Sequence, residues 1–150
     1  MRIIAFDQAR KSGWAYRSIS SNQIVYGTFD VGKHKNRCNR FVMFYNRVGE
    51  LLDRHGPFDV VSYEIPFVRN GAGAVSGYGY VAILELLTGQ RDKMLWSTNP
   101  MALKKFICGT GKATGRDVML AARRYVTKVD DEDEGAAIAL LIMTENTINA

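Results

Sequence analysis

The chain has 150 residues, of which 47% are hydrophobic, and its net charge is +5. This length suits a single domain over residues 1–150, and the composition argues against wholesale disorder. No apolar stretch approaches the roughly 20 residues that a membrane helix needs, and two cysteines are too few for a thiol metal site or a disulfide framework. We therefore expect a cytoplasmic globular protein that does not engage a membrane.

Five of the acidic residues lie in one run, from Asp130 to Glu134, so the remainder of the chain is more basic than the net charge suggests. A solvated helix start that complements the helix dipole would explain such a run. A basic body with one acidic locus is also what a metal-dependent phosphodiesterase requires. Basic residues hold the polyanion, and a metal lets the acidic locus accept a phosphate.

The expected elements alternate between strands and helices in chain order. Period-two patterns and buried apolar runs predict five strands, at residues 2–7, 14–16, 24–29, 58–64 and 94–97. Helical spacing and capping residues predict five helices, at residues 41–55, from the loop 70–73 to about 87, from Pro100, from the cap Thr114, and after the acidic run. The first three strands suggest an antiparallel meander, and the later ones run parallel because helices connect them. We expect an α/β fold with a mixed five-stranded sheet flanked by helices.

Four carboxylates occupy the ends of these elements. Asp7 ends the first apolar run, Glu64 ends the fourth strand, and Asp131 and Glu134 open the last apolar segment. If they converge, they form an oxygen-rich site suited to magnesium. Residues three apart share a helix face, so Asp131 and Glu134 could reach one metal, with Asp133 as a possible substitute for Glu134. A turn aspartate at position 7 and a strand-end salt bridge at position 64 are the structural alternatives.

Four motifs occur together in one order along the chain. They are Asp7–Ala15 (DQARKSGWA), Tyr63-Glu64, Gly109–Ala113 (GTGKA) and Asp131–Ala139 (DEDEGAAIA). In this combination the chain resembles the Holliday junction resolvases of the RuvC type, in the ribonuclease H-like superfamily, and is similar to the compact versions carried by bacteriophages. The motif after Asp7 is shorter than the family's usual one, and Glu134 stands where the family usually has aspartate.

The resemblance implies a homodimeric endodeoxyribonuclease that nicks two opposing strands of a four-way DNA junction and leaves 5′ phosphates. It implies Mg²⁺, with Mn²⁺ as a possible substitute, held by Asp7, Glu64, Asp131 and Glu134, and no nucleotide cofactor. One metal would activate a water, and a second would stabilise the leaving oxygen. Such an enzyme would work in the cytoplasm of a bacterial cell or of a phage-infected host.

The resemblance also assigns residues to the DNA. Lys104 matches a lysine near the scissile phosphate, and Phe67 matches an aromatic that stacks on an unpaired base, although a core position explains Phe67 equally well. Further phosphate contacts are expected from basic side chains that a solvated surface would also explain: Arg10, Lys11, Arg69, Lys105, Lys112 and Arg116. A possible dimer interface comprises residues 77–80 with Ile83, Leu84 and Leu87, for which packing against the sheet is the alternative.

Three other readings stay open. A less selective nuclease would cut flaps and other branched DNA. A non-catalytic junction-binding protein would be expected to have lost at least one acid, and all four positions here are carboxylates. A sugar-kinase-like enzyme, which also begins with an aspartate strand and a hairpin, would need a second domain of similar size. His34 and His55 do not resemble metal ligands.

Overall fold

The computed structural model describes residues 1–66 and 71–149. Five strands and five helices follow one another in the predicted order across these residues. The strands are β1 (Ile3–Asp7), β2 (Lys11–Arg17), β3 (Ile24–Asp30), β4 (Val60–Glu64) and β5 (Met94–Thr98). The helices are α1 (Arg37–His55), α2 (Gly71–Gln90), α3 (Pro100–Cys108), α4 (Gly115–Ala122) and α5 (Glu132–Ile148).

The strands form one mixed sheet in the order β3-β2-β1-β4-β5. The pairs β1/β2 and β2/β3 are antiparallel, whereas β1/β4 and β4/β5 are parallel. The predicted fold class is therefore confirmed, including the switch from a meander to parallel strands. In the pair β1/β4, Phe6 lies opposite Tyr63, so the two strands end beside each other.

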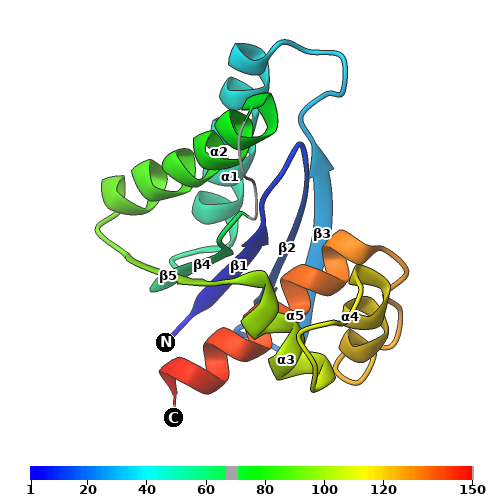
Figure 1. The fold of residues 1–150 in the computed structure, drawn as a ribbon. Helices are drawn as coiled ribbons and strands as arrows, with labels where there is room; N and C mark the ends of the chain where they lie inside the picture. The colour runs from blue at the N-terminus through cyan, green and yellow to red at the C-terminus, as the bar shows by residue number, and fades with distance from the viewer. Residues whose placement is uncertain (67–70, 150) are drawn as a thin grey trace.

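Each face of the sheet is covered by its own helices (Figure 1). Ile4 and Phe6 of β1 point to the face covered by α1 and α2, where Phe44, Leu84 and neighbouring side chains are fully buried. Ile3 and Ala5 point to the opposite face, where α5 packs on the sheet and α3 and α4 pack around it. Because side chains alternate along a strand, Asp7 points to the α5 face.

Local sequence sets where the helices begin. Asn36 and Asn99 cap α1 and α3 through their side chains, and Pro100 occupies the first turn of α3. Thr114 and Asp117 form a reciprocal capping box at the start of α4. These side chains satisfy N–H groups that have no partner within the helix.

The structure departs from the expected boundaries at several elements. β2 begins at Lys11 and not at residue 14, and α1 begins at Arg37 and not at residue 41. The glycines at 71 and 73, expected in a loop, already belong to α2. His55 ends α1 as predicted, and its ring stacks on Tyr16 at 5.2 Å between ring centroids, which gives it a packing role. Within the described residues, none of the helices is both long enough and apolar enough to cross a membrane.

Candidate active site at the ends of β1 and β4

Asp7 and Glu64 end neighbouring parallel strands on the α5 face of the sheet. Burial holds the pKa of Asp7 well above its ordinary value, and the charges of Glu64 and Asp133 raise this pKa further. Asp133 also hydrogen-bonds to the Asp7 side chain. Asp7 is therefore repelled by carboxylates of two other elements, Glu64 of β4 and Asp133 of α5, and a bound cation would relieve this repulsion.

The start of α5 reaches this position because β2 carries a glycine there. Gly13 pairs with Asp7 in the β1/β2 register. A Cβ atom on Gly13 would lie 1.9 Å from the carbonyl oxygen of Asp133, which no side chain could tolerate. The missing side chain thus lets the first turn of α5 lie directly over the end of β1.

Asp131 is the N-cap of α5, and its backbone is extended (φ −112°, ψ 131°). One carboxylate oxygen accepts hydrogen bonds from the N–H groups of Asp133 and Glu134, at 2.8 and 3.1 Å. The other oxygen accepts a hydrogen bond from Lys11. Burial acts to raise the pKa of Asp131, but the hydrogen bonds from Lys11 and the two N–H groups outweigh it and leave that pKa below its ordinary value.

Of the acids between Asp130 and Glu134, Asp133 has the largest effect on the pKa of Asp7. The carboxylates that raise the pKa of Asp7 are Glu64, Asp133 and Asp131. Glu134 instead raises the pKa of Tyr26 on β3, after the larger effect of burial. Burial raises the pKa of Glu134, and the charge of Asp131 raises it further, so these two carboxylates lie near each other although Asp131 is the N-cap. The choice between Asp133 and Glu134 as the fourth metal ligand stays a prediction.

Lys104 extends the site on the other side of Glu64. It lies on α3, half-buried, and its charge partly opposes the burial that raises the pKa of Glu64. The next residue, Lys105, is exposed. The helix therefore turns one lysine toward the carboxylates and the other toward solvent.

Gln8 is a contact that we did not predict from the sequence. Its side-chain N–H group donates a hydrogen bond to the main-chain oxygen of Glu64 at 2.6 Å, which ties the end of β1 to the end of β4. Its own side-chain oxygen is buried without a hydrogen-bond partner among the described residues. The sequence signal that could have predicted this contact is a side-chain amide directly after the aspartate at the end of β1.

Of the other predicted DNA contacts, one reaches the carboxylates and the rest of those described pair elsewhere or are exposed. Arg10 pairs with Asp30 at 3.1 Å, while Lys11 reaches into the site itself. Lys112 and Arg116 are exposed around the start of α4. Phe67 and Arg69 lie outside the described residues.

The carboxylates form an oxygen-only donor set at the edge of a buried face, which suits a hard divalent cation such as Mg²⁺ or Mn²⁺. As the side chains stand in residues 1–66 and 71–149, no three acidic, histidine or cysteine groups are close enough together to hold a metal ion. Asp131 and Asp133 are instead drawn toward Lys11. The donor chemistry therefore fits a metal, although the positions of the side chains do not yet form its shell.

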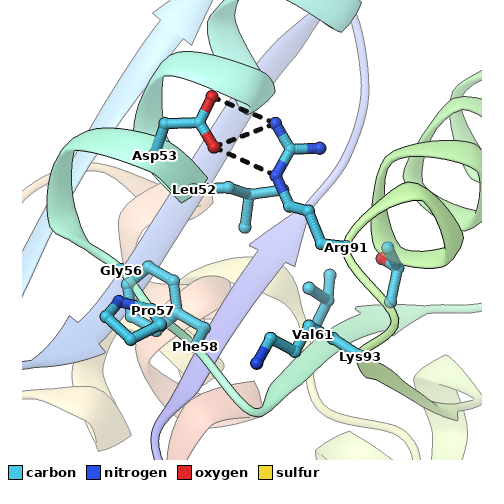
Figure 2. Close-up of a pocket in the computed structure, with 9 residues that line it drawn as sticks. Leu52, Asp53, Gly56, Pro57, Phe58, Val61, Arg91 and Lys93 are labelled. Carbon is cyan, nitrogen blue, oxygen red and sulfur yellow. Dashed lines mark hydrogen bonds and ion pairs between the residues drawn. The ribbon is translucent and has the colours of Figure 1, made fainter.

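A separate pocket of about 400 Å³ lies at the opposite end of the strands (Figure 2). Phe58 and Val61 line it from the start of β4, and the bidentate pair between Arg91 and Asp53, at 3.1 Å, forms one wall. Asp7 and Glu64 do not line this pocket. We assign it a packing role, in which the ion pair joins the ends of α1 and α2.

The mixed five-stranded sheet with its flanking helices has a ribonuclease H-like fold. Comparisons with known proteins show which proteins the chain is similar to. No protein-family model matches the chain. The chain is 29% identical over 135 residues to the crossover junction endodeoxyribonuclease RuvC of Pseudothermotoga lettingae, covering 85% of this chain and 83% of the relative. It is 23% identical to the protein of that name from Prochlorococcus marinus MIT 9301, over 99% of this chain and all of the relative.

Solved structures agree with these relatives. The Thermus thermophilus RuvC structure matches with a TM-score of 0.74 at 17% identity, over 99% of this chain and 97% of that one. The same protein in complex with a Holliday junction substrate matches with a TM-score of 0.77 at 16% identity, over 95% and 91%. The resemblance found in the sequence is thus confirmed: the chain is similar to RuvC proteins along nearly its whole length and shares their fold.

Proposed function

We propose that this protein is a metal-dependent endodeoxyribonuclease that resolves four-way DNA junctions by paired phosphodiester hydrolysis. The observation that carries the proposal is the position of Asp7 at the end of β1, beside the end of β4 with Glu64 and under the first turn of α5, which carries Asp133. The charge of Lys104 acts on Glu64 at the same place. The curated relatives are named crossover junction endodeoxyribonucleases, and a solved relative of the same fold is bound to a Holliday junction. A net charge of +5 is consistent with a polyanionic substrate.

Each residue of the site has a proposed part in the reaction. Asp7, Glu64, Asp131 and Asp133 would hold divalent metal, with Glu134 as the alternative to Asp133. When bound, the metal supplies an activated nucleophile and stabilises charge on the leaving oxygen. Lys104 would hold the phosphate next to Glu64 and neutralise charge that develops on it. Gln8 would keep the ends of β1 and β4 at a fixed separation.

The metal requirement is proposed for a divalent cation in general, with Mg²⁺ as the natural ion. Buried carboxylates in mutual contact cost free energy unless a cation or protons neutralise them. The raised pKa values of Asp7 and Glu64, caused mainly by burial, fit a site that needs its cation for full ionisation. Cleavage should therefore stop in a chelator and return when Mg²⁺ or Mn²⁺ is added.

We also propose a homodimer, through only part of the interface that we expected and through neighbouring side chains of α2. Tyr80, Leu84 and Leu87 of the expected interface are buried within the chain, at 3%, 0% and 1% exposure, so they pack against the sheet and α1. Other apolar side chains of α2 are about half exposed: Tyr78, which belongs to the expected interface, together with Val75 and Leu86. This second set offers a surface that a partner copy could cover.

The dimer proposal is tested by light scattering after gel filtration. The double variant Tyr78→Asp/Leu86→Asp should become monomeric, because two charges would be buried at the contact. Ile19→Asp, on the exposed turn between β2 and β3, is the matched control and should remain dimeric. A monomeric wild-type protein would contradict the proposal.

The function is tested with labelled four-way, three-way, flap and linear DNA in the presence of Mg²⁺. Symmetric paired nicks confined to the four-way substrate are expected, together with loss of cleavage but retained junction binding in Asp7→Asn. Equal cutting of all branched forms would favour a less selective branched-DNA endonuclease. Binding without cleavage in every metal tested would indicate a non-catalytic junction-binding protein.

A further inference from the structure

Lys11 spans the gap between the sheet and the start of α5. It is the first residue of β2, and its side chain points to the same face as Asp7 and Gly13. Its ammonium donates a hydrogen bond to Asp131 and lies 3.4 Å from the nearer carboxylate oxygen of Asp133. Both acids are candidate metal ligands, and Asp133 is also in contact with Asp7.

We propose that Lys11 is an internal counter-cation of the carboxylate site, bound by Asp131 and Asp133 when metal is absent and displaced from them when a divalent metal binds. This inference rests on the proposed function only in taking the acidic site to be a metal site. It changes the part expected of Lys11, which the sequence suggested as a phosphate contact.

The contacts of Lys11 make it a competitor for the metal. A monovalent ammonium and a divalent cation need the same carboxylate oxygens, and both cannot occupy them at contact distance. The remaining oxygen of Asp131 is already committed to the N–H groups of the α5 cap. The other oxygen of Asp131, which accepts the hydrogen bond from Lys11, is therefore the one available to a metal.

Displacement of Lys11 is physically inexpensive. Its side chain is 40% exposed, whereas those of Asp131 and Asp133 are 27% and 33% exposed. Exposed ion pairs contribute little, and a lysine stem turns into solvent without disturbing the backbone. Once released, the ammonium would stand at the rim of the site, where a DNA phosphate is its natural next partner.

The pair Arg17–Glu145 provides a matched comparison on the same two elements. Arg17 ends β2 on the same sheet face as Lys11, and it contacts Glu145 of α5 at 2.6 Å. Arg17→Met therefore removes one positive charge and breaks the ion pairing of a β2 side chain with α5, as Lys11→Met does, but at the other end of the strand. Any effect of lost net charge alone should appear equally in both variants.

The test is isothermal titration of the full chain with Mn²⁺ and with Mg²⁺, in the absence of DNA. Lys11→Met should bind metal about two- to tenfold more tightly than wild type, which is the range expected for releasing an exposed ion pair. Lys11→Arg, which keeps the charge, and Arg17→Met should bind like wild type. Circular dichroism and melting curves in chelator confirm that each variant is folded.

Failure of the proposed role of Lys11 can be distinguished from failure of the proposed function. Equal or weaker metal binding by Lys11→Met, compared with Arg17→Met, overturns the counter-cation and leaves Lys11 as a phosphate contact. If the wild type cleaves junctions while Lys11→Met binds metal no more tightly, the proposed function survives and this inference fails. If Lys11→Met binds metal more tightly but no DNA is cut, the inference survives and the proposed function fails. Absence of metal binding in all variants would refute both.

Discussion

Gly13 of β2 packs against the main chain of Asp133, so closely that a Cβ atom at Gly13 would lie 1.9 Å from the Asp133 carbonyl oxygen. This contact sets the height of α5 above the sheet, because any side chain at Gly13 must push the first turn of the helix outward. The same turn carries Asp133 to Asp7. The geometry of the proposed metal site thus depends on a glycine, which has no side chain of its own.

Gly13→Ala should consequently damage both activity and stability. Forcing extra volume into a packed contact typically costs about 1–3 kcal/mol, and a 1 Å misplacement of a reacting group can cost about 100-fold in rate. Urea unfolding and metal-dependent junction cleavage measure the two effects. The control is Gly89→Ala, on α2 with nothing within 4 Å of the added carbon. It should leave cleavage unchanged, and equal behaviour of the two variants would refute the packing argument.

The fourth carboxylate can be identified by comparing Asp133→Asn with Glu134→Gln. Both variants keep the shape of the side chain and remove its charge. Asp133 hydrogen-bonds to Asp7. The variant Asp133→Asn should therefore lose roughly 100-fold or more in cleavage rate, which is the size of effect seen when one preorganised electrostatic group is removed. Glu134 is not among the groups that raise the pKa of Asp7, and Glu134→Gln should lose only a few-fold. The reverse order would restore Glu134 as the ligand.

Replacement of Lys104 by methionine should shift the pH dependence of cleavage. Burial raises the pKa of Glu64, and the charge of Lys104 opposes this effect. Removing that charge in Lys104→Met would raise the Glu64 pKa further, so the acidic limb of the pH–rate profile should move to higher pH. Lys105→Met, on the exposed side of α3, should weaken DNA binding without moving that limb. An unchanged acidic limb in Lys104→Met would separate Lys104 from Glu64.

Asp7→Asn should stabilise the protein when metal is absent. The pKa of Asp7 is raised in the folded state, so the folded protein holds this proton more tightly than the unfolded chain. Stability is therefore lost as pH rises from the unfolded pKa through the folded one. The variant lacks this loss, and its melting temperature in chelator at neutral pH should exceed that of wild type by about 2–4 °C for each kcal/mol relieved.

Melting curves in chelator across pH test this expectation. Asp53→Asn provides the control, because Asp53 is exposed and pairs with Arg91 far from the site. It should show no gain at neutral pH. Added Mg²⁺ should stabilise the wild type more than Asp7→Asn, and identical pH dependence of these two proteins would contradict the burial of a strained charge at position 7.

Local patterns in the sequence were sufficient for much of the fold. Strand and helix order, the meander of the first three strands and the parallel fourth strand follow from periodicity, turn residues and the handedness of crossovers. The same patterns placed Asp7 and Glu64 at strand ends, because a charged residue that stops an apolar run marks the edge of a buried strand. These features are properties of short segments, so they survive without knowledge of distant contacts.

The tertiary structure decided which acid of the crowded run faces Asp7 and where Lys11 points. Five consecutive acids are chemically alike, and only the cap geometry of Asp131 and the contact at Gly13 set their rotation about α5. Lys11 and Asp131 are 120 residues apart in the chain, so their pairing depends on the packing of α5 over the sheet. The sequence shows which side chains are acidic or basic. Only the packing of the folded chain brings side chains from distant segments together.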